Sequence, residues 1–235
     1  MRATAIIPVK RFSHANQRLL SELDPRARAL VAGSMLTDVI AAVGACEPVE
    51  RIIVVSGEGR AERIALDGSK RFRTPLEVLQ DPVDKGHSEA ATLGIVRAKS
   101  LGASCVALLP GDCPLLDPAE LAAALRAHPG AGVGVIPDRH GSGTNGLILA
   151  PADAIRPAFG PDSRRIHLER AEARGLDGTL LELGSMGLDL DTPDDLVRMR
   201  ATLAEDPERA PETAEALLRI DAGPQARRTR RRPQA

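Results

Sequence analysis

The sequence predicts one α/β domain with a mostly parallel central sheet and an antiparallel hairpin. Its length of 235 residues suits one large domain. Short apolar runs alternate with segments of helical periodicity, the pattern of a sheet with crossover helices. One run, 106–109, breaks at a Pro-Gly pair and ends on Asp112. Ligands in open α/β sheets bind beyond the carboxyl ends of strands, so Asp112 is a candidate functional residue. The alternative is that Asp112 caps a turn.

Turn residues separate the expected elements in a regular order. The predicted strands cover 4–9, 51–56, 76–79, 106–109, 132–137, 145–149, 180–183 and 188–191. The predicted helices cover 25–45, 88–101, 118–128, 163–173 and 194–205, with a short helix ending near Leu66 and another containing 217–220. Asp-Pro or Thr-Pro pairs mark the starts at 24–25, 117–118 and 192–193. The strands 132–137 and 145–149 flank a polar glycine loop, typical of a hairpin that carries a substrate loop.

Composition disfavours nucleic acid and membranes as partners. The aromatic share is 1%, too low for the stacking platforms that bind single strands, and the net charge is −1. The basic segment 226–235 is expected to be a disordered, solvated tail. Polar residues interrupt the apolar stretch 30–46, and the N-terminus lacks a long apolar signal region. Three cysteines without metal-ligand spacing fit a reducing compartment, so we expect a cytoplasmic protein.

A basic loop follows the first predicted strand. Lys10, Arg11 and Arg18 supply cations there, and backbone N–H groups could line a phosphate cradle. The loop has no glycine-rich phosphate fingerprint, and the alternative is ordinary solvated surface.

Two acidic clusters follow strand-like residues. One is Asp112 and the other is Asp189 with Asp191, in LDLDTPDDL. If their strands are neighbours, these carboxylates converge, and carboxylates without Cys or His suit Mg²⁺ or Mn²⁺. Helix capping is the alternative for one acidic residue of the second cluster.

Basic and hydroxyl groups lie on the loops between the acidic clusters. They are Arg139, His140, Ser142, Thr144, Ser163, Arg164, Arg165 and His167. The turn FGPDS at 159–163 presents N–H groups and a hydroxyl at a helix start, which favours an anion. A basic loop, a metal pair and an anion pocket together suit phosphoryl or nucleotidyl transfer. His140 and His167 are interpreted as surface residues, and no Ser-His-Asp or Cys-His arrangement is evident.

These motifs resemble the CofC/FbiD guanylyltransferases of coenzyme F420 biosynthesis, in the MobA-like nucleotidyltransferase superfamily. The resemblance spans residues 4–199 and rests on IIPVKRFSHANQRL, LLPGDCPLL, PDRHGSGTNGL, FGPDSRRIHLERA and LDLDTPDDL. It implies a Rossmann-like, GT-A/MobA-like domain over 1–205, with a C-terminal helix and tail over 206–235. PDRHGSGTN combined with FGPDS is the specific part, whereas GDCPLL is shared widely in the superfamily.

The resemblance implies transfer of GMP from GTP to a phosphorylated three-carbon acid, with release of pyrophosphate. The acid would be phosphoenolpyruvate, 2-phospho-L-lactate or 3-phospho-D-glycerate. The implied metal is Mg²⁺ or Mn²⁺, and the expected protein partners are the downstream F420 transferase and a second copy of the chain. By motif, the catalytic residues are Asp112, Asp191 and Lys10, the metal ligands Asp112, Asp189 and Asp191, the acceptor-binding residues Thr144, Gly160, Ser163, Arg139 and His140, and the nucleotide-binding residues Pro8, Lys10, Arg18, Gly86 and Ser88.

Two positions depart from the family pattern. Asn16 replaces a lysine of the basic loop, and the chain reads Gly86-His87-Ser88 where the family has GxN. The alternatives are another MobA-like nucleotidyltransferase acting on molybdopterin or a sugar phosphate, a nucleotide-diphosphate glycosyltransferase, and a non-catalytic nucleotide-binding module.

Overall fold

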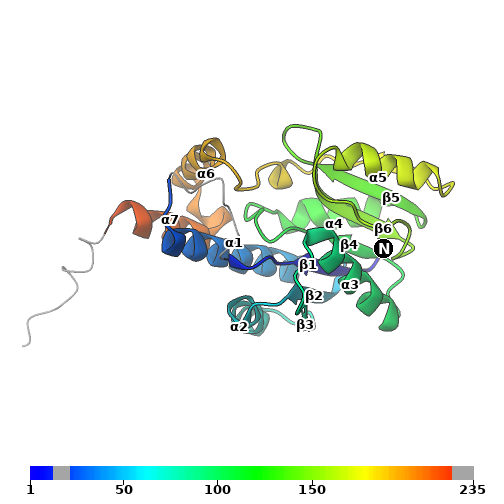
Figure 1. Cartoon of the computed structure of the whole chain (residues 1–235), viewed down its shortest axis with the longest axis horizontal. Coiled ribbons are helices and arrows are strands. Elements are labelled where there is room, and N and C mark those ends of the chain that lie inside the picture. Colours follow the sequence, from blue (N-terminus) through cyan, green and yellow to red (C-terminus); the bar gives the residue numbers. More distant parts are fainter. Residues whose placement is uncertain (13–21, 224–235) are drawn as a thin grey trace, which may run out of the picture.

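The strands form one twisted sheet that runs through the molecule (Figure 1). The computed structural model describes residues 1–12 and 22–223. The strands are β1 (Ala3–Pro8), β2 (Val49–Ser56), β3 (Leu76–Gln80), β4 (Val106–Leu108), β5 (Gly132–Pro137), β6 (Thr144–Ala150) and β7 (Gly178–Leu180). Their order in the sheet is β3-β2-β1-β4-β6-β5-β7, and β6 runs antiparallel to both neighbours. The other strand pairs in this described sheet are parallel, so the predicted mostly parallel sheet with one hairpin is confirmed.

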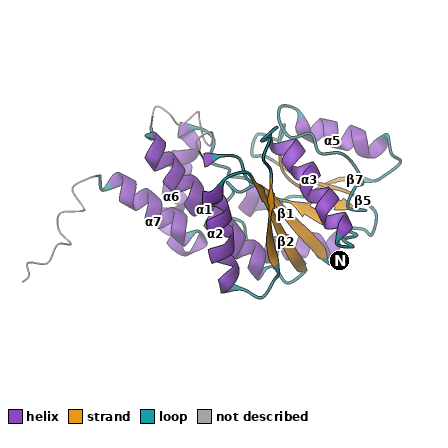
Figure 2. Cartoon of the chain, turned by 60° about the horizontal axis from the view of Figure 1, so that its bottom comes forward, coloured by secondary structure: helices purple, strands orange, loops and turns teal. Residues whose placement is uncertain are grey.

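Helices cover both faces of the sheet (Figure 2). They are α1 (Pro25–Ala45), α2 (Gly59–Gly68), α3 (His87–Ser100), α4 (Pro118–Ala127), α5 (Ser163–Glu172), α6 (Pro193–Glu205) and α7 (Pro211–Asp221). The core residues of α1, α2, α4, α6 and α7 belong to one hydrophobic cluster, and those of α3 and α5 belong to the other. Alternate residues of β1 serve the two cores, with Ile7 in one and Ile6 in the other.

The helix starts follow the capping signals in the sequence. Asp24 accepts hydrogen bonds from the N–H groups of Arg26 and Ala27 at 2.8 Å each, at the start of α1. Asp117 accepts from the N–H of Ala119 at 2.7 Å at the start of α4. Each of these helices, like α6, has proline in its first turn, where the missing N–H leaves no hydrogen bond unmade.

A glycine allows α3 to lie close to the sheet. A Cβ on Gly94 would come within 2.3 Å of the Ile6 side chain and 3.2 Å of Val55. The Gly94 backbone therefore approaches β1 and β2 more closely than any other residue type permits.

Helix α1 is a core helix that the C-terminal helix α7 packs against. It is long and apolar enough to cross a membrane by length and composition alone, but 56% of its apolar window is buried within the fold. Its buried Asp38 accepts hydrogen bonds from the Glu212 N–H at 3.1 Å, the Thr213 N–H at 2.8 Å and the Thr213 hydroxyl at 2.6 Å. These bonds satisfy N–H groups in the first turn of α7 and fix it on α1.

Some predicted elements differ from the structure. The expected strand 188–191 does not form, because the chain leaves the sheet after β7, makes a 3₁₀ turn at Gly184–Met186 and crosses to α6 as an irregular segment. The predicted strand 180–183 is shifted to β7. The buried run 106–109 was expected in a parallel environment, but β4 is parallel to β1 and antiparallel to β6. The expected tail 226–235 lies outside the described residues.

Candidate active site

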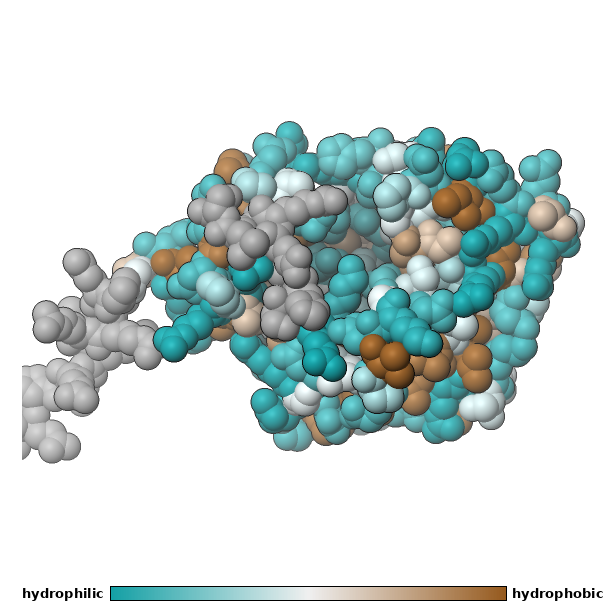
Figure 3. Space-filling view, viewed as in Figure 1, coloured by the Kyte–Doolittle hydropathy of each residue, from teal (hydrophilic) through white to brown (hydrophobic). Residues whose placement is uncertain are grey.

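The predicted site residues gather at one edge of the sheet. Lys10 follows the carboxyl end of β1, and Asp112 lies in the turn after β4. Because β6 is antiparallel to β4, its amino end, with Thr144, lies at the same edge. Figure 3 shows a hollow in this face, between the half of the molecule that holds α6 and α7 and the half that holds α5. The topology therefore places basic, acidic and hydroxyl groups together, as the sequence predicted.

Three carboxylates influence one another at this edge. The half-buried Asp112 has its pKa raised from 3.8 to about 7, first by loss of hydration and then by the negative charge of Asp189, with a smaller contribution from Asp191. The charge of Lys10 opposes this rise. Burial also raises the pKa of Asp189, to which the charges of Asp195 and Asp191 add. The two acidic clusters of the sequence thus meet in space.

The carboxylates of Asp112, Asp189 and Asp191 fit a hard divalent cation that substrate phosphates and water also coordinate. Burial and the neighbouring negative charges raise the pKa of Asp112 even though the charge of Lys10 opposes the rise, and a bound cation would add further positive charge there. Among residues 1–12 and 22–223, no three His, Cys, Asp or Glu side chains are arranged to hold a metal by themselves. Mg²⁺ is commonly held by one or two carboxylates, with substrate phosphates and water completing its shell. The residues present fit that kind of site.

Two buried polar side chains hold the segment that carries Asp189 and Asp191. Asn145 donates from Nδ2 to the Met186 carbonyl at 2.8 Å and to Asp189 Oδ1 at 3.5 Å. Asp195 Oδ2 accepts from the N–H groups of Asp191 at 3.2 Å and Thr192 at 2.7 Å, the latter in a capping box at the start of α6. Neither Asn145 nor Asp195 was among the site residues predicted from the sequence. The Thr-x-x-Asp spacing at 192–195, which is typical of a capping box, could have identified Asp195.

Arg139 joins the hairpin loop to α6. Its Nη1 lies 2.7 Å from Asp195 Oδ1 and 3.3 Å from Asp194 Oδ2, and the Asp195 side chain is only 3% exposed. The Arg139 charge therefore balances a buried carboxylate, while His140 beside it is exposed. Acceptor binding by Arg139 and His140 stays a prediction, and Arg139 also has this structural role.

Helix α5 carries the predicted acceptor residue Ser163 and contacts a second one, Thr144, through His167. Ser163 opens α5 and is fully buried, and its Oγ has no hydrogen-bond partner among the described residues. His167 lies one turn further on the same helix, and its Nδ1 is 3.1 Å from Thr144 Oγ1. Gly160, just before the helix, has φ 131°, a conformation that glycine adopts without strain. The expectation that His167 lies at the surface is wrong, because its exposure is 0%.

The nucleotide-side residues lie on β1 and at the start of α3. Pro8 is buried in β1 and Lys10 is exposed. Gly86 precedes α3 with φ 102°, and a Cβ there would meet nothing within 4 Å. Ser88 Oγ accepts from the Phe159 N–H at 2.9 Å and so ties α3 to the turn 159–163, which is called the acceptor turn below. The Arg18 and Asn16 assignments lie outside the described residues.

His87, one of the departures from the family pattern, packs edge-on against Phe159 with ring centres 4.7 Å apart. Burial, followed by the charge of Lys10, lowers the pKa of His87 to about 4. The neutral His87 ring and the Ser88 hydroxyl therefore both join the start of α3 to Phe159.

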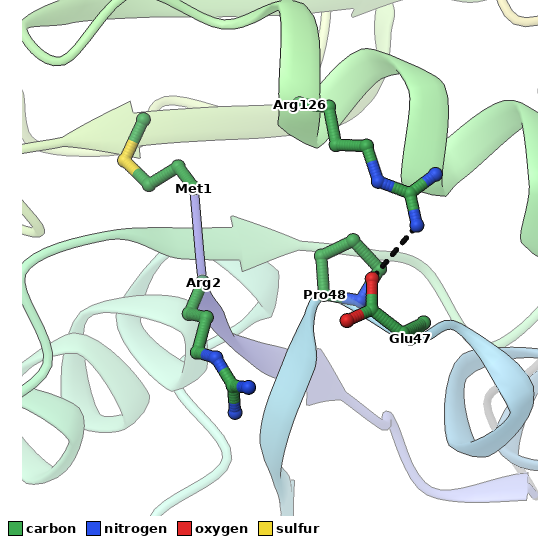
Figure 4. A pocket seen from close by; sticks show the side chains of 5 residues that line it. All are labelled: Met1, Arg2, Glu47, Pro48 and Arg126. Atoms are coloured by element: carbon green, nitrogen blue, oxygen red, sulfur yellow. Dashed lines mark hydrogen bonds and ion pairs between the residues drawn. The ribbon is translucent and has the colours of Figure 1, made fainter.

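A shallow pocket lies at the opposite edge of the sheet and does not belong to this site. It is lined by Met1, Arg2, Glu47, Pro48 and Arg126 (Figure 4). Met1 and Arg2 precede β1, Glu47 and Pro48 precede β2, and Arg126 in the last turn of α4 forms an ion pair of 2.7 Å with Glu47.

Known proteins share both the fold and the sequence of this chain. A nucleotidyl transferase from Methanothermobacter thermautotrophicus matches with a TM-score of 0.61 and 19% identity, over 87% of this chain and 98% of that one. A putative nucleotide-diphospho-sugar transferase from Desulfovibrio desulfuricans matches with a TM-score of 0.69 and 16% identity, over 94% and 96%. These similarities show the nucleotidyltransferase fold.

Sequence relatives are more specific. A phosphoenolpyruvate guanylyltransferase of Conexibacter woesei is 41% identical over 87% of this chain and 90% of its own length. One of Sphaerobacter thermophilus is 36% identical over 83% and 91%. The family model described as guanylyl transferase, CofC like, matches residues 3–205. The chain therefore belongs to the CofC-like guanylyl transferase family.

Proposed function

We propose that this chain transfers GMP from GTP to the phosphate of phosphoenolpyruvate and releases pyrophosphate. The relatives cited above are named phosphoenolpyruvate guanylyltransferases and align over most of this chain, which supports the guanylyl group and the acceptor of the proposal. The observation that carries the proposal in the structure is Ser163, whose buried hydroxyl has no partner in the described residues. Ser163 opens the helix whose His167 lies 3.1 Å from Thr144. Buried polar groups almost always have partners, so a ligand oxygen is the natural one here.

The proposed chemistry needs no strong base. A phosphate monoester has its second pKa near about 6 and is largely ionised at neutral pH. Its oxygen attacks the α-phosphorus of GTP, a P–O–P link forms, and the bond to the leaving pyrophosphate breaks. The barrier comes from bringing two polyanions together in line, so positioning and charge neutralisation carry the catalysis.

The chain's residues divide this work by position. Asp112, with Asp189 or Asp191, would hold Mg²⁺ or Mn²⁺, which when bound neutralises phosphate charge. Lys10 would face the GTP phosphates from the end of β1. Thr144, Gly160 and Ser163 would hold the acceptor phosphate or carboxylate. Pro8, Gly86 and Ser88 would line the nucleotide side, as the family resemblance implies.

The acceptor and the pathway form the finer part of the proposal. The alternatives 2-phospho-L-lactate and 3-phospho-D-glycerate differ from phosphoenolpyruvate by a few atoms. The proposed product is a diphosphate-linked guanosine adduct that enters coenzyme F420 biosynthesis. A downstream transferase and a second copy of the chain stay predicted partners, and the cytoplasm stays the predicted compartment.

The test is incubation of the purified chain with GTP, Mg²⁺ and each of the three acids, followed by mass analysis of adducts and detection of pyrophosphate. We expect the largest turnover with phosphoenolpyruvate. An adduct formed faster with another acid would overturn the choice of acceptor. Release of GDP in place of pyrophosphate would overturn nucleotidyl transfer.

A further inference from the structure

His167 is a fully buried polar ring between the acceptor turn and β6. Its exposure is 0%, and it lies one turn after Ser163 on the same face of α5. The Phe159 ring packs against it, with ring centres 5.6 Å apart at 71°. A polar ring withdrawn from water in this way needs partners for both nitrogens, and both have them.

The two partners determine which nitrogen carries the proton. The backbone N–H of Ala158 lies 2.8 Å from His167 Nε2. A backbone N–H can only donate, so Nε2 is the unprotonated acceptor and Nδ1 of the neutral ring carries the hydrogen. Burial, with the charge of Arg170, lowers the pKa of His167 to about 4, which keeps the ring neutral at physiological pH.

This tautomer dictates what Thr144 can offer a ligand. His167 Nδ1 lies 3.1 Å from Thr144 Oγ1, so the ring donates and the hydroxyl accepts. A threonine hydroxyl has one proton and two lone pairs, and its proton therefore remains for a different partner. Phosphate and carboxylate oxygens at neutral pH accept hydrogen bonds and do not donate them, so a donor is what an anionic acceptor requires.

We propose that His167 is a positioning residue that fixes the Thr144 hydroxyl as a hydrogen-bond donor to the phospho-acid acceptor. The inference rests on the proposed function. It assigns the ring no contact with substrate and no proton transfer. The same ring holds the Ala158 N–H two residues before Gly160, so one side chain joins β6, the acceptor turn and α5.

The test uses substitutions that separate the two hydrogen bonds of the ring. His167→Gln places a carbonyl oxygen near the Nε2 position, where it can accept from Ala158, and removes the donor to Thr144. We expect it to raise the KM for the acceptor about tenfold, the effect of losing one hydrogen bond to a charged group, and to change the KM for GTP less than twofold. Thr144→Val should give a similar rise. The double variant should show about the same tenfold rise and not a hundredfold one, because both changes remove one interaction.

The matched control is His128→Gln. His128 is also a buried histidine, 7% exposed, but it caps the end of α4 and bonds the Pro129 carbonyl, away from the site. We expect its acceptor KM to stay at the wild-type value. An acceptor KM of His167→Gln within twofold of wild type, or additive effects in the double variant, would overturn the role of His167. Failure of the wild-type enzyme to form any adduct would instead overturn the proposed function.

A second measurement does not depend on turnover or on the folding of a variant. Two-bond ¹H–¹⁵N correlation spectra of the wild-type protein identify the protonated nitrogen of each histidine. We expect His167 to carry its proton on Nδ1 at pH 7. A proton on Nε2, or an imidazolium ring, would refute the inference whatever the kinetics show.

Discussion

Replacing Asp112 with asparagine should change how stability depends on pH. In the folded protein the Asp112 pKa is about 7, against an ordinary value of 3.8. Between these values the folded state keeps a proton that the unfolded state has lost, so the free energy of unfolding falls as pH rises toward 7 and is level above it. At about 1.4 kcal/mol per pH unit, the loss between pH 5 and pH 8 is roughly 3 kcal/mol. Asp112→Asn has no carboxyl at this position and does not show this loss. The unfolding free energy of the variant minus that of wild type should therefore increase by roughly 3 kcal/mol from pH 5 to pH 8.

The assay is urea unfolding followed by far-UV circular dichroism, because the chain has no Trp or Tyr for intrinsic fluorescence. Unfolding free energies are measured from pH 5 to pH 8 with a chelator present. Asp117→Asn is the control. Asp117 is an exposed aspartate of the same loop that caps α4, and asparagine caps a helix equally well. Curves for Asp112→Asn and wild type that stay parallel over this range would refute the carboxylate cluster. Added Mg²⁺ at pH 8 should stabilise wild type more than Asp112→Asn.

Three further predictions follow from buried polar groups. Asp38→Ala should destabilise the protein by about 2 kcal/mol in urea unfolding, because the first turn of α7 loses its buried acceptor, and an unchanged midpoint would contradict that role. Ser163→Ala should change the free energy of unfolding by less than about 0.5 kcal/mol, because Oγ has no partner among the described residues. It should weaken binding of the phospho-acid more than binding of GTP, and equal weakening of both in titrations would refute the assignment. Arg139→Gln should cost about 3 kcal/mol by leaving the Asp195 carboxylate buried and unpaired, and Asp195→Asn in the same chain should recover part of it; additive losses would argue against the ion pair.

The acidic cluster was predictable because strand ends in an α/β sheet obey a general rule. An apolar run that stops at Pro-Gly and delivers Asp112 identifies a strand end, and the LDLD motif identifies a second acidic segment. The alternation of leucine and aspartate in LDLD also predicted a strand at 188–191, which the structure lacks. Leu190 is buried and Leu188 packs against the same core, but the segment has no strand partner among the described residues and its polar groups bond to Asn145 and Asp195.

The residues that support the site were harder to find from sequence. Asp195 looks like one more charged residue in a first turn, and its burial depends on Arg139, 56 positions earlier, folding across it. His167 lies in a polar, arginine-rich helix, where a histidine is ordinarily solvated. Its burial comes from Phe159 and the hairpin, contacts that no local periodicity encodes. Long-range packing, which the sequence pattern does not specify, thus decides these roles.

The most direct test of the whole account is one reaction mixture analysed by mass. The wild-type chain, GTP, Mg²⁺ and phosphoenolpyruvate should yield one guanosine adduct of the acid for each pyrophosphate released. Asp112→Asn, confirmed as folded by circular dichroism, should yield neither product. Full turnover by that variant, or no adduct from wild type with any of the three acids, would contradict the claim that converging carboxylates at this sheet edge bring two anions together.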